Sequence, residues 1–117
     1  MFLAGDSAHV NNSVGGLGLN GGIHDAMELV DTLHQVITKQ GSEALLDRYT
    51  RRRRTMNIEF VQEQTILNKK RLEERDPKAR QARFDELLAI AEDPQKHKEF
   101  LLRTSLTASV RKAQSIQ

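Results

Sequence analysis

The sequence predicts a mostly α fold, with a residual strand, a glycine-rich loop and about four helices. Three observations carry this prediction. From residue 23 onward, apolar side chains recur with the 3.6-residue period of amphipathic helices. Two Asp-Pro pairs, Asp76-Pro77 and Asp93-Pro94, are typical helix starts, because Asp caps a helix and Pro fits its first position. Five of the seven glycines lie between residues 15 and 22, which indicates one specialised loop.

The N-terminal segment is the part of the chain with strand character. The apolar run Met1–Ala4 precedes Gly5-Asp6, and we interpret it as the end of a buried strand. Residues 5–22 are expected to form loop and turn. A strand that ends in Gly-Asp and continues through glycines into a helix brings backbone amides close to a planar or anionic ligand. This stretch is therefore the part of the chain that indicates a ligand-binding function.

The first two helices follow from periodicity and capping. The first is expected from Ile23, with Gly41 at the position of a C-cap glycine. Ser42 is expected to cap the second, which extends from about Glu43 to Arg75. A straight helix of that length would span roughly 50 Å, so we expect a bend or a projecting end. The apolar face of the first helix comprises Ile23, Ala26, Met27, Val30, Leu33 and Ile37.

The last two helices begin at the Asp-Pro pairs. The third is predicted over residues 78–92 and the fourth over about 95–113. The predicted core residues of the last three helices are Leu45, Leu46, Tyr49, Met56, Phe60 and Leu67, then Leu87, Leu88 and Ile90, then Phe100, Leu101, Leu106 and Val110.

Length and composition exclude several classes of protein. A chain of 117 residues forms one domain at most, and 38% apolar with 29% charged residues is typical of a soluble, folded chain. The absence of cysteine excludes disulfides, thiolate nucleophiles and cysteine metal sites. His24, His34 and His97 lack partners at metal-ligand spacing, so no metal is expected. No membrane-spanning or signal segment is evident, and we expect a cytoplasmic location with no membrane partner.

Charge is distributed unevenly along the chain. Residues 1–42 hold four acids and one base, whereas the remainder is basic and contains the run Arg51–Arg54. Such a run can indicate nucleic-acid binding. However, four consecutive residues of a helix point in different directions, and acids are interleaved with the bases. We therefore favour a solvated helix face with some ion pairs, and no nucleic-acid partner.

The residues of the loop carry a specific resemblance. They read Gly5-Asp6-Ser7-Ala8-His9, then Gly15-Gly16-Leu17-Gly18-Leu19-Asn20-Gly21-Gly22, and then Asp25-Ala26. The pattern resembles the second flavin-binding motif of the FAD-dependent aromatic hydroxylases, the monooxygenases of the para-hydroxybenzoate hydroxylase type. That motif reads Gly-Asp-Ala-Ala-His, a proline, a Gly-x-Gly-Leu-Asn turn and Asp-Ala on a helix. Ser13 stands where many members have the proline, which bears on substrate orientation more than on the cofactor.

The resemblance implies that the chain is the C-terminal piece of an α/β FAD-binding, Rossmann-like monooxygenase fold. Residues 1–41 would be the C-terminal part of the FAD-binding domain and residues 42–117 a helical C-terminal tail. The adenine-dinucleotide fingerprint, which is a Gly-x-Gly-x-x-Gly after an N-terminal strand with an acid roughly 20 residues later, is absent here. The expected partners therefore include a missing N-terminal part of the flavoprotein. Alone, the chain is expected to lack catalytic competence and to self-associate through bare apolar surface.

The resemblance also implies roles for individual residues. Asp6 would accept a hydrogen bond from a ribityl hydroxyl of FAD, or alternatively cap the following turn. The loop glycines would let the backbone approach the flavin ring, or alternatively only make the loop flexible. The N–H groups of Leu19 and Asn20 would face the negative charge of the reduced ring. The predicted cofactor-binding residues are Gly5, Asp6, Gly15, Gly16, Gly18, Leu19 and Asn20; no catalytic residue is predicted.

Two further motif residues have simpler interpretations. Asp25 is either an acid that complements the helix dipole or a hydrogen-bond acceptor that pins the glycine loop. His9 is expected to be a structural histidine.

The leading functional hypothesis is an FAD-binding segment of a flavin-dependent monooxygenase. It would hydroxylate an aromatic or related organic substrate with NAD(P)H and dioxygen, the cofactor supplying the chemistry. A related flavin oxidoreductase shares the motif and stays open. The alternative from a different class is a non-catalytic helical interaction module that retains a relic flavin motif. An upstream Gly-x-Gly-x-x-Gly unit would discriminate in favour of the enzyme.

Overall fold

The computed structural model describes residues 1–117. Most of the chain is helical, as predicted, and no strand is present. In chain order the elements are the 3-10 turn η1 (Gly5–Ser7), α1 (Leu17–Ile37), α2 (Ala44–Met56), the π-helical segment η2 (Asn57–Gln62), α3 (Glu63–Glu73), α4 (Pro77–Glu92), α5 (Pro94–Thr104) and α6 (Thr107–Ser115).

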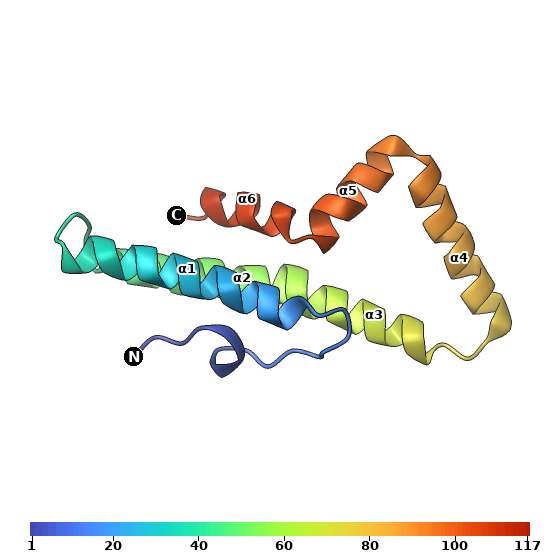
Figure 1. Cartoon of the computed structure of the whole chain (residues 1–117), viewed down its shortest axis with the longest axis horizontal. Coiled ribbons are helices and arrows are strands. Elements are labelled where there is room, and N and C mark those ends of the chain that lie inside the picture. Colours follow the sequence, from blue (N-terminus) through green and yellow to red (C-terminus); the bar gives the residue numbers. More distant parts are fainter.

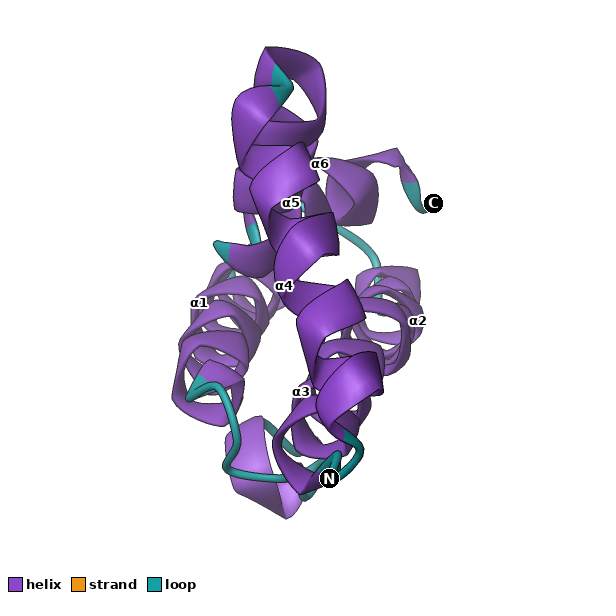
Figure 2. Cartoon of the chain, turned by 90° about the vertical axis from the view of Figure 1, so that its right-hand side faces the viewer, coloured by secondary structure: helices purple, strands orange, loops and turns teal.

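The helices form an antiparallel layer with a projecting arm. Helix α1 lies antiparallel to the continuous run of α2, η2 and α3, with the N-terminal segment on one side and α6 on the other (Figures 1 and 2). Helices α4 and α5, here called the arm, lead away from this layer and return to it (Figure 1). The radius of gyration is 17.2 Å, against about 13 Å for a compact chain of this length. The arm therefore makes the molecule elongated.

The hydrophobic core is small and lies where α1, the junction of α2 with η2, and the C-terminal helix α6 meet. It joins the first residue of α1, the junction of α2 with η2, and the turn and helix at the C-terminal end. Its buried members are Leu17, Met56, Phe60, Val61, Leu106 and Ala113. Neither helix of the arm contributes a buried residue. None of the helices combines the length and apolar character that a membrane crossing requires.

The strand predicted for Met1–Ala4 is not formed. Ala4 has extended backbone angles, with φ −142° and ψ 150°, but the chain offers no second extended segment to pair with it. A strand needs a neighbour for its backbone N–H and C=O groups. Here Leu3 is tied instead through its carbonyl, which accepts a 2.7 Å hydrogen bond from the hydroxyl of Tyr49.

Helix α1 corrects two expectations. It starts at Leu17, so residues 17–22 are helix and not loop, and it packs through the face opposite to the predicted one. The inward face carries Gly21, Asp25 and Thr32. The predicted apolar face is exposed, at 48% for Ile23, 64% for Met27, 65% for Val30 and 75% for Ile37. Periodicity identified the apolar face correctly but not what would cover it.

The connection between α1 and α2 also differs from expectation. Helix α1 ends at Ile37, and the residue with a left-handed backbone is Lys39, with φ 57°, rather than Gly41. Gly41 matters for space, because a Cβ there would collide with the side chain of Leu45. Ser42 does not cap α2, whose N-terminus has no side-chain cap.

The two Asp-Pro starts are confirmed. Asp76 accepts from the N–H groups of Lys78 and Ala79, and Asp93 accepts from those of Gln95 and Lys96. Each Asp is therefore the N-cap of a helix whose first residue is proline.

The second predicted helix, residues 43–75, and the fourth, residues 95–113, are each interrupted in the middle. The second is interrupted by η2, whose wider turn lets the adjacent residues Phe60 and Val61 both face inward. The fourth is split at Leu106, which adopts φ 60° and is 2% exposed. Burial of this leucine in the core compensates for a left-handed backbone that costs roughly 1–2 kcal/mol.

Several predicted core residues face solvent instead. The third helix, α4, has no neighbour along most of its length, so its apolar positions stay largely uncovered (Figure 1). The exposed members of the predicted set are Leu67, Leu87, Leu88, Leu101 and Val110.

Candidate functional site

The Gly-Asp turn lies against the first turns of α1. Gly5, with φ 63°, opens the short 3-10 turn, and its Cα lies so near Gly22 that a Cβ on Gly22 would come within 3.2 Å of it. Asp6 is exposed and makes no hydrogen bond or ion pair inside the chain. It is therefore not a cap of the following turn, and its carboxylate is free for a ligand.

The carboxylate of Asp6 lies over the N-terminus of α1. A Cβ built on Gly18 would be 3.9 Å from Asp6 Oδ1. The N-cap is Gly16, with φ 65°, so no side chain caps the helix. The N–H groups of the first helical turn, which include Leu19, therefore lack partners and carry the positive end of the helix dipole. The acceptor Asp6 and the N–H donors of the first turn of α1 therefore lie side by side at one edge of the molecule.

The predicted glycines do not all face this edge. A Cβ on Gly15 would lie 2.5 Å from the side-chain nitrogen of Asn68, so Gly15 makes room for α3. No atom lies within 4 Å of a Cβ built on Gly16, and only Asp6 lies near Gly18. Asn20 is the fourth residue of α1, where the N–H is satisfied within the helix, so its exposed side chain is the group left for a ligand.

A buried ionic cluster supports the turn from behind. Asp25 is fully buried, at 0% exposure, and both its carboxylate oxygens are used. Oδ1 accepts from Arg53 Nε at 2.6 Å, while Oδ2 accepts from the N–H of Gly5 at 2.9 Å and lies 2.7 Å from His9 Nε2. We call these four residues the Asp25 cluster. Of the two interpretations of Asp25, the structure favours the acceptor that pins the loop, and His9 is structural as predicted.

Arg53 is the residue of this cluster that sequence reasoning missed. It was placed on a solvated face, yet it is 6% exposed and also lies 3.7 Å from Glu28. The signal was its position: Arg53 follows Tyr49 by four residues and precedes Met56 by three, so it belongs to the buried stripe of α2. Its neighbours Arg51 and Arg52 bind carbonyls at the C-terminal end of the chain.

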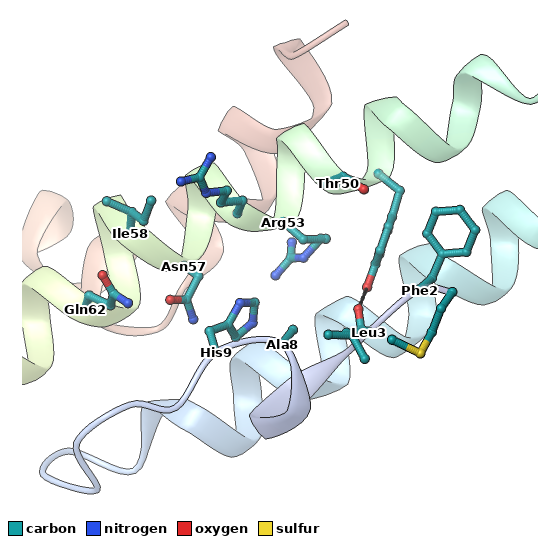
Figure 3. A pocket seen from close by; sticks show the side chains of 12 residues that line it. Phe2, Leu3, Ala8, His9, Thr50, Arg53, Asn57, Ile58 and Gln62 are labelled. Atoms are coloured by element: carbon teal, nitrogen blue, oxygen red, sulfur yellow. Dashed lines mark hydrogen bonds between the residues drawn. The ribbon is translucent and has the colours of Figure 1, made fainter.

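A hollow of about 510 Å³ separates the N-terminal segment from α2 and η2. His9 and Asn57 lie near one another at one end of it, and Arg53 extends from α2 beside them (Figure 3). Phe2 and Leu3 form its apolar end (Figure 3). The side-chain oxygen of Asn57 is buried here without a hydrogen-bond partner. Sequence reasoning did not foresee this hollow, because it depends on the π-helical turn.

Burial and charge shift two pKa values near the cluster. Burial and then the Arg53 charge lower the pKa of His24, although Asp25 acts in the opposite direction. Burial and then the charge of Asp25 raise the pKa of the Tyr49 hydroxyl to about 12. His24 is therefore kept neutral and Tyr49 is kept as a hydrogen-bond donor to Leu3.

The donor set at this edge suits an organic cofactor. No group of three or more His, Asp or Glu side chains is arranged to hold a metal. One free carboxylate, Asp6, lies beside uncapped amides at Gly18 and Leu19. A ligand with hydroxyls and an electron-rich planar ring would match a carboxylate acceptor and helix N-terminal donors.

Comparison with known proteins bears directly on this edge. A family model described as "FAD binding domain" matches residues 1–64. Para-nitrophenol 4-monooxygenase of Pseudomonas sp. (strain WBC-3) is 41% identical over 80 residues, which are 68% of this chain and 20% of that protein. 6-Hydroxy-3-succinoylpyridine 3-monooxygenase of Pseudomonas putida (strain DSM 28022 / S16) is 43% identical over 77 residues, 66% of this chain and 20% of that protein.

A third relative comes from another genus. Tetracenomycin B2 monooxygenase-dioxygenase of Streptomyces olivaceus is 43% identical over 63 residues, which are 54% of this chain and 12% of that protein. The chain thus spans about a fifth or less of the length of these relatives. No solved structure matches it.

Proposed function

The chain belongs to the family of FAD-binding domains, and from this premise we propose that it is the flavin-contacting segment of a monooxygenase. The proposed reaction is hydroxylation of an aromatic or related organic substrate with NAD(P)H and dioxygen. One observation carries the proposal: the free carboxylate of Asp6 lies over the uncapped N-terminus of α1. The related proteins are named as monooxygenases, which favours this function over a relic interaction module.

Different residues along this edge would bind the ribityl chain and the ring of FAD. Asp6 would accept a hydrogen bond from a ribityl hydroxyl. Gly16 and Gly18 carry no side chain that would keep the flavin ring away from the backbone. The N–H of Leu19 and the side chain of Asn20 would donate toward the electron-rich edge of the ring. When bound, FAD supplies the redox chemistry, and these residues hold and orient it.

Gly5 and Gly15 support the site without facing it. Gly5 donates its N–H to Asp25 and so sets the backbone from which Asp6 extends. Gly15, with φ 98°, turns the loop past Asn68 of α3.

The exposed apolar surfaces indicate where the rest of the flavoprotein would pack. The stripe of α1 from Ile23 to Ile37 and the segment Met1–Leu3 are both uncovered. We propose that an N-terminal part with the Rossmann-like sheet covers them, and that Met1–Ala4 then pairs as a strand. In this arrangement residues 1–41 complete the FAD-binding domain, and residues 42–117 form its helical tail. The chain alone would self-associate through the same surfaces.

Fragment complementation tests the proposal. Para-nitrophenol 4-monooxygenase is cut before the segment that aligns with this chain and is produced together with the 117-residue chain. The expected result is a purified pair that retains FAD, whereas the chain alone and the pair carrying Asp6→Ala retain little.

The relative's own aligned segment serves as the matched control. If that segment restores FAD binding to the cut enzyme, but the well-folded 117-residue chain associates without restoring it, the proposed cofactor role is wrong. Helical circular dichroism of the chain shows whether it is folded in either case.

A further inference from the structure

Arg53 reaches the Asp6 turn through one buried carboxylate. Its Nε donates to Oδ1 of Asp25 at 2.6 Å, and the other oxygen of Asp25 accepts the N–H of Gly5 at 2.9 Å. Gly5 directly precedes Asp6, so this amide belongs to the turn that presents the free carboxylate. Because Asp6 makes no bond of its own inside the chain, its position depends on its backbone.

The two buried members of this cluster, Asp25 and Arg53, depend on one another. Asp25 is 0% exposed and Arg53 is 6% exposed. A buried carboxylate is stable only when charge and hydrogen bonds compensate for lost hydration. Without the guanidinium, the buried carboxylate of Asp25 would lack its compensating charge and would move toward water, and its bond to Gly5 would be lost with it.

The position of Arg53 is in turn fixed by contacts that lead to the C-terminal end of the chain. Its second contact is Glu28, at 3.7 Å, and Glu28 also lies 3.4 Å from Arg52. Arg52 donates to the carbonyls of Gln114 and Ile116, beyond the core contacts of α6. A continuous set of charged contacts therefore joins the C-terminal end of the chain to the Gly-Asp turn.

We infer that Arg53 is a positioning residue of the proposed flavin site, acting through Asp25 on the turn that carries Asp6. This inference rests on the proposed function. It assigns part of the arginine run Arg51–Arg54 to the cofactor site rather than to the protein surface. Arg54 supplies a matched control, because it is the next residue on the same helix, is exposed and has no ion-pair partner.

Arg53→Lys is the informative variant. Lysine keeps the positive charge but lacks the planar fork that places donors toward Asp25 and Glu28 together. In the 117-residue chain, we expect hydrogen exchange at the Gly5 amide to rise about tenfold, as measured by NMR. In the complemented enzyme, we expect FAD affinity to fall by about ten- to a hundredfold, since small misplacements have effects of this size. Arg54→Lys should change both less than twofold.

A second control separates positioning from general stability. Leu106→Ala weakens the core away from the cluster and is compared with Arg53→Lys at the same margin below the melting temperature. If Arg53 positions the turn, only Arg53→Lys exposes the Gly5 amide and weakens FAD binding. Equal losses of FAD affinity in the two variants would overturn the inference, as would a protected Gly5 amide in Arg53→Lys.

Failure of the proposed function gives a different pattern. In that case the unmodified chain fails to restore FAD binding, whereas the relative's own segment succeeds. The Gly5 amide measurement needs no FAD, so it still decides whether Arg53 controls the turn. Arg53→Gln, which removes the charge, should exceed Arg53→Lys in its effect on Gly5 if it remains helical; a smaller effect would contradict the inference.

Discussion

The cluster around Asp25 and the arm made of α4 and α5 are built by opposite means. The cluster joins segments 16 to 28 residues apart through a carboxylate with 0% exposure. The arm buries no residue. Within residues 76–99, each of its side-chain hydrogen bonds joins residues at most four positions apart in the sequence. The cluster is held by long-range polar contacts. The arm is held mainly by local helix signals and is joined to the layer at its end, where Arg103 donates to the carbonyl of Glu59 and to Glu63. Substitutions should therefore act globally in the first and locally in the second.

The largest expected effect is that of Asp25→Ala. It leaves Arg53 and His9 without their buried partner, and breaking such a pair costs about 3–5 kcal/mol. We expect the midpoint of urea unfolding to fall sharply or the cooperative transition to vanish. Asp85→Ala in α4, which removes only an exposed bond from Gln81, is the matched control and should change stability by less than about 0.5 kcal/mol. Similar losses in the two variants would contradict the comparison.

The next effect concerns binding rather than folding. Asp6→Ala in the complemented enzyme should remove a charge-assisted hydrogen bond of about 1.5–3 kcal/mol. FAD affinity should then fall by about ten- to more than a hundredfold. Asp6→Asn should do less harm, because its amide oxygen still accepts. The chain alone should lose no more than about 0.3–1 kcal/mol of stability in either variant, since Asp6 has no hydrogen-bond partner inside it and meets only the helix dipole. A larger loss with intact flavin affinity would show a structural role.

A smaller effect depends on pH at the edge of the cluster. The pKa of Tyr49 is about 12 in the folded chain and about 10 when unfolded. The folded state thus retains the proton longer, so this contribution to stability is complete below pH 10 and is lost between pH 10 and pH 12. Urea unfolding over that range should show it, and Tyr49→Phe should abolish it. Tyr49 is the chain's one tyrosine, so its ultraviolet titration reports the pKa directly, and a midpoint near 10 would contradict the prediction.

The smallest effect is expected in the arm. Asp76→Ala removes the N-cap of α4, whose carboxylate accepts from Lys78 and Ala79. The cost should be about 1 kcal/mol and should appear as fraying of residues 77–80 in hydrogen exchange. Asp76→Asn should retain most of the cap. Faster exchange at the Gly5 amide in Asp76→Ala would show that the arm is coupled to the cluster, and would break the distinction between the two regions.

The difference between the two regions also explains what could be predicted from the sequence. Helix starts at Asp76 and Asp93 were predictable, because a cap and a proline act within a few residues. The split at Leu106 was not, because a left-handed leucine is stable only where a distant core receives its side chain. The uncovered faces of α1 and α4 were missed for the same reason: periodicity describes a face but not its partner.

The candidate site was predictable to a similar degree. The Gly5-Asp6 turn and the glycine entry to α1 were evident, because the spacing of special residues along the chain encodes them. The need for Arg53 was hidden, because its partner Asp25 lies 28 residues away and the run Arg51–Arg54 was interpreted as a solvated helix face. The burial of Asn57 and the hollow beside it depend on the π-helical turn, which no local sequence signal predicts.

The return of α6 to α2 has a consequence in polymer terms. Arg103 donates to Glu59 and Glu63, Lys112 pairs with Glu59, and Leu106 enters the core. Residues 74–102 therefore form one excursion that leaves the layer and comes back to it. For a flexible chain, the entropy of closing such an excursion would vary only with the logarithm of its length. The excursion consists of two stiff helices, however, so each residue added to or removed from one of them moves the point of return by about 1.5 Å along that helix. The lengths of α4 and α5 are therefore constrained by the place where the chain rejoins the layer.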